Sequence, residues 1–553
     1  MTETTKSIRM KPSLNSSASV ETVVRSFDIG DAEFSVDGVI DFYWPLDNKK
    51  SSEVMNSVTS KLIPYITQNE EKFPELLAVR LLFKWFVCEV LRLLEATILA
   101  AECKKDSITP IIPKHYKKLH AVYNSNNLEC IFFLNQSSGP SYGRNIPRTL
   151  KRFGKEFLWN GLQGGLFRKY GSNMNDVLAI GPSKLAIQHA KGANKLLRYS
   201  AFDEWFSSIP QNLILKDSEE LVGLPSILDI VQDSFSAAGY EISPESVRYL
   251  STWVNQAKNF VNYHIHKGND LLNKIRGDVW FGCGGSSVWH VMLIEKLRRK
   301  GIKVVTHDHG AGTAHHEQTP VHWVEYMHTD HFVTFNKINE KIRNGQFNSK
   351  LIFGQSNPII QSLDSVLGNK STEIGSRIIK TSNRIKKIMY VGAAFHGEGA
   401  RLRPIFHDMT YFDWQIKLLS HLKKLNMDVI YKPHPEGATG VPANFAESFD
   451  FRSTTERLES IEEDVDAYVI DFVFSTTTPI VLRSNKPVFF INLGFPELLP
   501  EALDLIKKRC YYLEAEYTID SRLNVDFDQF DRFMNEKEHI FDAHFSDLYF
   551  NNL

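Results

Sequence analysis

A histidine set between two prolines ends one of the apolar segments of the chain. Residues 429–437 read VIYKPHPEG, in which an apolar run leads into Lys432 and His434. Pro433 and Pro435 each fix a backbone φ angle, which lowers the entropy lost in aiming the imidazole. A strand end that must hold an imidazole and an ammonium beside an anion needs this combination. The alternative is a surface turn with an incidental histidine.

A run of hydroxyl side chains follows a second apolar segment. Residues 474–479 read FSTTTP, so Ser475, Thr476 and Thr477 come immediately before an expected helix. Free backbone N–H groups and the positive end of the helix dipole favour an anion at such a position. Simple helix capping is the alternative, but one hydroxyl suffices for it. The two clusters together predict a phosphate site that needs no metal.

Both clusters lie in a series of strands that alternate with helices. The expected strands, with the apolar spacing of strands, cover residues 386–395, 427–435, 466–474 and 486–494. The expected helices, with helical apolar spacing, cover residues 412–426 and 476–485. A shorter series precedes it, with strands at 278–282 and 302–310 and a helix at 288–301. Strands joined through helices form parallel sheets. The pattern therefore predicts an α/β protein with two doubly wound, Rossmann-like sheets in tandem.

The same pattern divides the chain into expected segments. Apolar runs at 130–134 and 176–180 are expected to add strands to the first sheet. We expect a disordered tail at residues 1–25 and a largely helical first domain at 26–340, with a βαβ unit around 277–310. A polar linker at 341–385 and a second domain at 386–553 are expected to follow. Ligands of such sheets bind outside the carboxyl ends of strands, so a cleft between the two domains is the expected site.

Composition limits the classes of protein that fit. The chain has 553 residues, 42% hydrophobic and 23% charged, with a net charge of −1, which favours a folded core and does not favour nucleic acid as a partner. Five scattered cysteines and a polar N-terminus without an apolar core are typical of a cytoplasmic protein. The most apolar stretch, 76–101, is interrupted by charges at helical spacing. A buried amphipathic helix is expected there, and peripheral contact with a membrane stays open as an alternative.

A histidine-rich segment, THDHGAGTAHHEQ at 306–318, follows a strand of the first series. If a bound hydroxyl group is to react, it must lose a proton, and a carboxylate or imidazole must take it. Asp308, His309 and Glu317 are the candidates for this base. Structural hydrogen bonding is one alternative. A metal site is another, with His307, His309, His315, His316 and Glu317 as its potential ligands, although their spacing matches no standard motif.

Two further loops follow strands. The turn GCGGSS at 282–287 contains half of a dinucleotide fingerprint, which is weak evidence for NAD. We expect Ser286 and Ser287 to line the acceptor side of the cleft. Arg401 and Arg403, in a glycine-containing loop, could pair with the carboxylate of a ligand, and a solvated loop is the alternative.

The three motifs KPHPE, STTTP and KPVFFI, in this order, resemble a known family. They are similar to the C-terminal domain of bacterial GT-B glycosyltransferases with a His-Pro and a Ser/Thr motif. These include the capsule and lipopolysaccharide sialyltransferases and Kdo transferases and, more distantly, the CDP-glycerol polymerases. The resemblance covers roughly residues 386–499 and one βαβ unit of the first domain, where His309-Gly310 resembles a His-Gly pair of the polymerases.

The resemblance implies a donor and roles for the motif residues. The donor would be a CMP-activated 2-keto sugar acid, such as sialic acid or Kdo. His434 would contact or protonate the leaving phosphate, and Ser475, Thr476 and Thr477 would bind it. Lys432, Pro435 and Glu436 belong to the same expected nucleotide site.

We therefore expect a metal-independent glycosyltransferase without a cofactor, which acts on a glycan or a lipid-linked glycan of a bacterial surface. Three alternatives stay open. They are a glycerophosphotransferase that uses CDP-glycerol, a non-catalytic binding subunit of a polysaccharide assembly complex, and a metal-dependent hydrolase.

Overall fold

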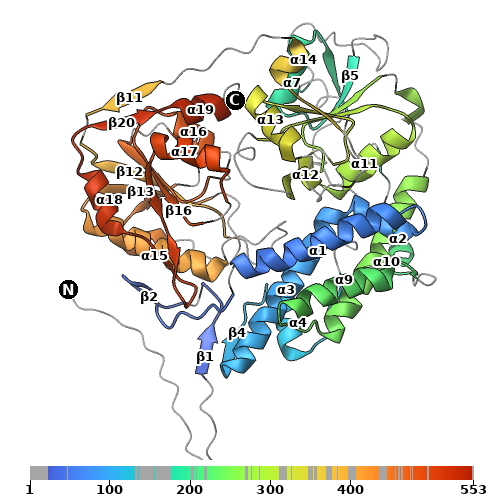
Figure 1. Cartoon of the computed structure of the whole chain (residues 1–553), viewed down its shortest axis with the longest axis horizontal. Coiled ribbons are helices and arrows are strands. Elements are labelled where there is room, and N and C mark those ends of the chain that lie inside the picture. The colour runs from blue at the N-terminus through green and yellow to red at the C-terminus, as the bar shows by residue number, and fades with distance from the viewer. Residues whose placement is uncertain are drawn as a thin grey trace, which may run out of the picture.

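The computed structural model has a mixed α/β architecture with two six-stranded parallel sheets (Figure 1). The structure describes residues 23–30, 32–46, 48–130, 135, 155, 176–200, 205–206, 208–216, 221–267, 272–275, 277–285, 287–310, 320–325, 327–346, 353, 358–368, 377–382, 384–395, 407–434, 445–454, 456–458, 461, 465–473, 475, 477–494 and 497–550. The expected tail, residues 1–25, lies outside them except for its last three residues.

The first sheet has the strand order β10-β9-β8-β7-β5-β6. Its strands are β5 (Asp176–Ile180), β6 (Leu196–Tyr199), β7 (Val279–Phe281), β8 (Val304–His307), β9 (His331–Thr334) and β10 (Ile359–Ser362). The helices that follow them along the chain are α7 (Lys184–Gly192), α11 (Val288–Arg299), α12 (Pro320–Glu325), α13 (Lys337–Gln346) and α14 (Leu363–Leu367). β7, β8 and β9 are buried along their whole length, as expected for a parallel sheet that is covered on both faces.

The predicted βαβ unit is confirmed, and its helix has the predicted end signals. The Ser287 hydroxyl caps α11 by accepting the backbone N–H of His290 at 3.3 Å. At the other end Gly301 has φ +70°, and the next backbone N–H, of Ile302, bonds to the carbonyl of Leu297 at 3.0 Å. This is the left-handed C-terminal cap that favours glycine.

The second sheet has the strand order β14-β13-β12-β15-β16-β17, which is 3-2-1-4-5-6 when the strands are numbered along the chain. Its strands are β12 (Lys387–Val391), β13 (Asp428–Lys432), β14 (Arg452–Ser453), β15 (Ala467–Ile470), β16 (Val488–Asn492) and β17 (Tyr511–Glu514). The helices are α15 (Asp408–Lys424), α16 (Thr478–Arg483), α17 (Pro500–Arg509), α18 (Phe527–Met534) and α19 (His544–Tyr549). This order is typical of doubly wound sheets, in which ligands bind where the strand order reverses.

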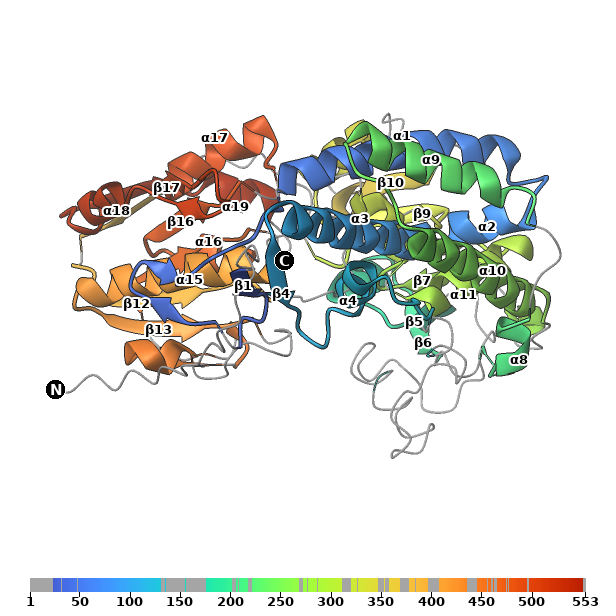
Figure 2. The ribbon, with the colours of Figure 1, turned by 90° about the horizontal axis from the view of Figure 1, so that it is seen from below.

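A layer of helices packs against the first sheet on the side of α11 and α12, which is below that sheet in Figure 1 and in front of it in Figure 2. The layer consists of α1 (Asn48–Asn69), α2 (Pro74–Leu81), α3 (Phe83–Lys105), α4 (Lys117–Asn124), α8 (Gln211–Ile214), α9 (Leu224–Ala237) and α10 (Pro244–His266). Within it, α10 packs on α11 and α3 packs on α12. The helical character expected for the first part of the chain is therefore present.

The apolar stretch 76–101 forms two helices instead of the single predicted one. Leu82, with φ −104° and ψ 22°, separates α2 from α3. Two of the charges that interrupt the stretch are buried and paired: Arg80 contacts Glu70, and Glu89 lies 2.9 Å from Lys118. Among the helices that the structure describes, none is both long and apolar enough to cross a bilayer.

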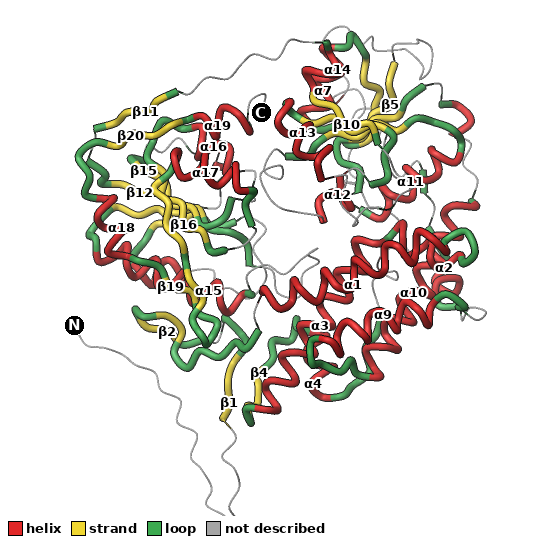
Figure 3. Tube along the Cα trace, viewed as in Figure 1, coloured by secondary structure: helices red, strands yellow, loops and turns green. Residues whose placement is uncertain are grey.

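Short two-stranded ribbons complete the fold (Figure 3). They pair β1 (Val23–Ser26) with β4 (Ile108–Ile111), β2 (Phe34–Ser35) with β3 (Gly38–Val39), β11 (Ile378–Thr381) with β20 (His539–Asp542), and β18 (Glu516–Tyr517) with β19 (Leu523–Asn524). Much of the described part of the stretch expected as a linker, 341–385, is thus regular structure. It contains the end of α13, strand β10, helix α14 and strand β11, each of which is too short for its apolar spacing to stand out in the sequence.

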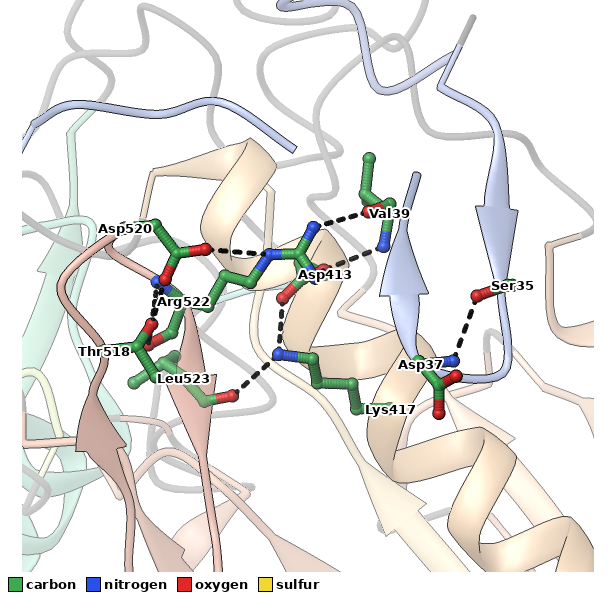
Figure 4. A network of polar contacts seen from close by, with 9 residues as sticks. All are labelled: Ser35, Asp37, Val39, Asp413, Lys417, Thr518, Asp520, Arg522 and Leu523. Atoms are coloured by element: carbon green, nitrogen blue, oxygen red, sulfur yellow. Dashed lines mark hydrogen bonds and ion pairs between the residues drawn. The ribbon is translucent and has the colours of Figure 1, made fainter. Parts of the chain in front are cut away.

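The β2–β3 hairpin joins the N-terminal part of the chain to the second sheet. The backbone N–H of Val39 donates to the buried carboxylate of Asp413 on α15 at 2.8 Å, and Arg522 donates to the Val39 carbonyl at 2.6 Å. Lys417 pairs with Asp413 at 3.0 Å and donates to the carbonyl of Leu523 (Figure 4). Residues almost five hundred positions apart are therefore joined by hydrogen bonds.

The two sheets meet near the C-terminus. Asn336, which follows β9, donates its amide to the carbonyl of Tyr549 on α19 at 3.1 Å. Helix α19 also packs on α16, which follows β15, and on α13. A shared apolar cluster includes Phe335 from the first sheet and Phe545 from α19. The carboxyl ends of β9 and β15 are thus directed to the same region of the molecule.

Candidate functional site

The strand order of the second sheet marks one position for a ligand. Strands β12 and β15 are neighbours, and the chain leaves them toward opposite edges of the sheet. In sheets of this kind, loops that leave neighbouring strands in opposite directions form the crevice in which ligands bind, so a crevice is expected at the carboxyl ends of β12 and β15. The described residues of these loops are 392–395 after β12 and 471–473, 475 and 477 after β15.

The first predicted cluster lies on β13, on one side of β12. Lys432 is the last residue of β13, is 2% exposed, and pairs in register with Val391 of β12. Its carbonyl accepts the backbone N–H of Gly392 at 3.1 Å, so the ladder continues to the end of both strands. His434 follows two residues later and is half-buried. The imidazole is thus attached to the sheet at the carboxyl edge, as predicted.

The second predicted cluster lies beyond β15, on the other side of β12. The hydroxyls of Ser475 and Thr477 are 2.9 Å apart, and the backbone N–H of Thr477 donates to the Ser475 hydroxyl at 3.3 Å. Thr477 precedes α16, yet its side chain makes no capping hydrogen bond. The capping alternative therefore does not describe Thr477. Helix α16 has only six residues, so its dipole is too weak to form an anion site by itself. The hydroxyls of Ser475 and Thr477 are therefore the groups that would bind an anion here.

The two clusters share one edge of one sheet. Only β12 separates β13 from β15, and neighbouring strands lie ~4.8 Å apart, which puts the two strand ends roughly 10 Å from each other. A ligand the size of a nucleotide can span this separation. Ser475 and Thr477 therefore follow a strand that borders the expected crevice, and His434 follows the strand on the other side of β12.

A buried carboxylate that the sequence did not single out lies under this edge. Asp471, the first residue after β15, accepts hydrogen bonds from Tyr390 at 2.5 Å, from Tyr411 at 3.1 Å and from the Trp414 indole at 3.0 Å. Burial raises the pKa of Asp471 to about 6, although the three donors work in the opposite direction. The sequence offered an aspartate at the end of an apolar strand as the only signal.

On the first sheet, the candidate base Asp308 already has partners. It is fully buried after β8, where its carboxylate accepts from Thr334 at 2.8 Å and from the backbone N–H of Gly310 at 3.1 Å. It also forms a buried ion pair with Arg343 at 2.8 Å. With these partners, the carboxylate of Asp308 has the contacts of a group that stabilises the fold. His309, the next residue, is exposed at the same strand end.

The histidine before them has a structural role. The Nδ1–H of His307 donates to the carbonyl of Phe281 at 2.9 Å, so its Nε2 accepts from the Nδ1 of His189 at 3.0 Å. Burial lowers the pKa of His307 to about 3, which keeps the ring neutral. Because both ring nitrogens are occupied, His307 is not available as a metal ligand. The described residues contain no group of three or more side chains able to hold a metal ion.

The glycine turn after β7 is explained by packing. A Cβ on Gly282 would lie 2.2 Å from the carbonyl oxygen of Gly181, and one on Gly284 would lie 2.6 Å from that of Glu325. The first glycine lets the turn approach the loop after β5, and the second lets α12 lie against it. Ser287 is used as the cap of α11. These residues position the first sheet and its helix.

Glu325, at the end of α12, is a second carboxylate that the sequence did not indicate. It is 4% exposed, and its Oε2 has no hydrogen-bond partner among the described residues. Burial raises the pKa of Glu325, and the nearby negative charge of Asp308 raises it further. The charges of His309 and Arg343 lower this pKa, as does the hydrogen bond from the backbone N–H of His309 to the carboxylate. Nothing in the local sequence distinguishes this residue, because its surroundings are supplied by β8 and α13.

Several predicted site residues lie outside the described part of the chain. They are Ser286, Glu317, Arg401, Arg403, Pro435, Glu436 and Thr476, together with the potential metal ligands His315 and His316. Of the predicted site, the structure therefore describes Lys432, His434, Ser475, Thr477, Asp308, His309 and Ser287.

No protein family model matches the chain, and no curated protein matches it significantly.

Proposed function

We propose that the protein is a glycosyltransferase of GT-B architecture that transfers a 2-keto sugar acid from a CMP-activated donor to a glycan acceptor. One observation carries the proposal. Ser475 and Thr477 border the switch point of a sheet with the order 3-2-1-4-5-6, and His434 lies at the same edge. An imidazole and paired hydroxyls at such an edge suit the phosphate of a nucleotide.

The position of the first sheet supports a reaction between two bound substrates. The carboxyl ends of β9 and β15 approach each other around α19, through Asn336 and Tyr549 on one side and the packing of α16 on the other. A donor held at the second sheet would therefore face residues at the carboxyl edge of the first. This arrangement agrees with a GT-B enzyme, in which the acceptor lies between the two sheets.

The chemistry assigns a task to each edge. The bond between the anomeric carbon and the phosphate oxygen breaks as the acceptor oxygen bonds to that carbon, and CMP leaves with an additional negative charge. His434, protonated, would donate to the phosphate, and the hydroxyls of Ser475 and Thr477 would hydrogen-bond to it. Donors that are already in place when charge develops lower the barrier most.

The acceptor hydroxyl must transfer its proton to a base on the first sheet. Asp308 is occupied by Arg343, so two described groups remain at that edge, His309 and Glu325. His309 is exposed to solvent, and the raised pKa of Glu325 shifts it toward the working pH of a general base.

Calorimetric titration of the whole chain with CMP, CDP, UDP, GDP and NAD tests the proposal. We expect CMP to bind and the single variants Ser475→Ala and Thr477→Val to weaken it by about tenfold each, the effect of one hydrogen bond to a charged group. Ser484→Ala is the matched control, because its hydroxyl bonds to the carbonyl of Val481 at the far end of α16.

Three outcomes would contradict the proposal. Preference for CDP would favour the glycerophosphotransferase, and binding of NAD would favour an oxidoreductase. Binding of CMP without its release from any CMP-sugar acid, with acceptor present, would favour a binding subunit.

A further inference from the structure

Three hydrogen-bond donors from two elements converge on the carboxylate of Asp471. Tyr390 comes from β12, whereas Tyr411 and Trp414 come from α15. All three are far from Asp471 in the sequence, and the carboxylate is 1% exposed. A carboxylate is the only side chain of this size that accepts hydrogen bonds with both of its oxygen atoms and donates none.

The direction of each hydrogen bond follows from this acceptor. The amide of Gln415 donates to the Tyr390 oxygen at 3.0 Å, and Tyr431 donates to the other side of Gln415 at 3.1 Å. The Tyr390 hydroxyl therefore donates its hydrogen bond to Asp471, and the Tyr431 hydroxyl donates its own to Gln415. Burial, and next the negative charge of Asp471, raises the pKa of Tyr390 and of Tyr411 well above 10.0, so both remain donors.

Tyr411 extends the network to the loop that follows β12. Its hydroxyl accepts the backbone N–H of Ala393 at 2.6 Å while it donates to Asp471. The preceding Gly392 is pressed against the same network, because a Cβ there would lie 2.7 Å from the amide nitrogen of Gln415. The loop on the β12 side of the crevice is thus attached to the Asp471 carboxylate through one phenol.

The loop on the β15 side begins at Asp471 itself. Four residues later it reaches the hydroxyl of Ser475, which pairs with that of Thr477 at 2.9 Å. The described groups that face the carboxylate are Tyr390 on β12, Tyr431 on β13, and Tyr411, Trp414 and Gln415 on α15, all without charge. No cation among the described residues balances the charge, so the donors alone hold it.

We propose that Asp471 is a positioning residue that holds the two loops of the crevice in the spacing that the ligand requires. It acts on the β12 loop through Tyr411 and Ala393, and on the β15 loop through its own backbone. The role of the crevice as a nucleotide site rests on the proposed function, but the attachment of the two loops does not. Protonation of the carboxylate would give it a donor in place of an acceptor and would release one of the three groups it holds.

Amide hydrogen exchange at Ala393, followed by mass spectrometry on the whole chain, tests the attachment directly. We expect Tyr411→Phe and Asp471→Asn to increase the exchange of this amide by at least about tenfold at pH 7, after correction for the intrinsic rate. In the unsubstituted protein the same increase is expected as the pH falls below about 6, the pKa of Asp471. Tyr411→Phe removes only the connecting hydroxyl, so it decides the question if Asp471→Asn does not fold.

Asp466→Asn is the matched control. Asp466 lies at the opposite end of β15, where its carboxylate accepts the backbone N–H groups of Lys386 and Lys387 at 2.8 and 2.9 Å. Exchange at Ala393 should be unchanged in this variant. Titration with CMP adds a second readout, with at least about tenfold weaker binding expected for Tyr411→Phe and none of this loss for Asp466→Asn.

The outcomes separate the two proposals. If Ala393 exchanges at the unsubstituted rate in both Tyr411→Phe and Asp471→Asn, the positioning role is wrong. If exchange increases but the unsubstituted protein does not bind CMP, the positioning role stands and the proposed function fails. If exchange increases and CMP affinity does not change, the network holds the β12 loop without serving the ligand, and the positioning role for binding is overturned.

Discussion

Arg343 and Asp308 form an ion pair of 2.8 Å in which both side chains are almost closed to solvent, at 1% and 0% exposure. The pair joins the end of β8 to α13, which follows the neighbouring strand β9. A motif that looked catalytic in the sequence therefore contains a carboxylate that is used to hold two elements of the first sheet together.

Asp308→Asn should lower the free energy of unfolding by about 3–5 kcal/mol, because it leaves the guanidinium of Arg343 buried without its counter-charge. Urea denaturation followed by circular dichroism measures the change. Asp450→Asn is the control, since its ion pair with Lys423 is exposed and should contribute little. A variant of normal stability that has lost turnover would instead return Asp308 to a catalytic role.

His434→Ala should lower turnover with a CMP-sugar acid by roughly a hundredfold or more, the effect of removing one preorganised donor from a developing anion. The fold should persist, because the side chain is only half-buried at the sheet edge. Release of CMP is the assay. His421→Ala, which removes a histidine from α15 that pairs with Asp531 at 2.7 Å, should leave turnover unchanged. Equal rates for the two variants would exclude His434 from the reaction.

Glu325→Gln should change the dependence of stability on pH. The folded-state pKa of Glu325 is raised above its ordinary 4.5, so between these two values the unfolded chain releases a proton that the folded chain keeps. The free energy of unfolding of the unsubstituted protein therefore falls as the pH rises through this window, and glutamine removes this contribution.

Thermal unfolding midpoints of both proteins between pH 4 and pH 8 measure the difference. The variant should gain stability relative to the unsubstituted protein as the pH rises. A difference between the two midpoints that stays constant with pH would mean that the carboxyl group has no shifted pKa in the folded state.

Gly38→Ala should undock the β2–β3 hairpin from α15. Gly38 has φ +112°, and a Cβ there would lie 2.2 Å from Oδ1 of Asp413, the oxygen that accepts the hydrogen bond from the backbone N–H of Val39. Gly277→Ala is a close control, because Gly277 has φ +123° but no atom within 4 Å of the added carbon. Both variants bear the backbone cost of about 1–3 kcal/mol, and only the first adds the clash.

Limited proteolysis measures the undocking, with faster cleavage near residues 33–40 expected in Gly38→Ala alone. Equal cleavage of both variants would mean that backbone strain accounts for the whole effect and that the contact with Asp413 does not hold the hairpin.

The sequence predicted the elements of the two sheets well where the signals are local. Helix α11 was predicted from its apolar spacing, its serine and its terminal glycine, and these residues do cap the helix. Strand β15 was predicted over 466–474 but ends at Ile470. The next residue, Asp471, is hydrogen-bonded to Tyr390, Tyr411 and Trp414. Apolar spacing does not show where a polar residue finds its partners.

The candidate site was predictable in part for the same reason. Proline and hydroxyl motifs are visible in a few consecutive residues, so His434, Ser475 and Thr477 could be named from the sequence. The donors of Asp471 lie 57 to 81 residues away from it, and no local pattern connects them. The order of the strands was also not predictable, although it decides that β12 lies between the two motifs.

The hairpin near the N-terminus has a consequence for how the protein is made. Val39 leaves the ribosome long before Arg522, which lies 483 residues further along and completes its docking site. At about 5–20 residues per second, the hairpin waits roughly 25–100 s for this partner. The β2–β3 hairpin is therefore made early but completes its docking late, and a chaperone that shields it would act in that interval.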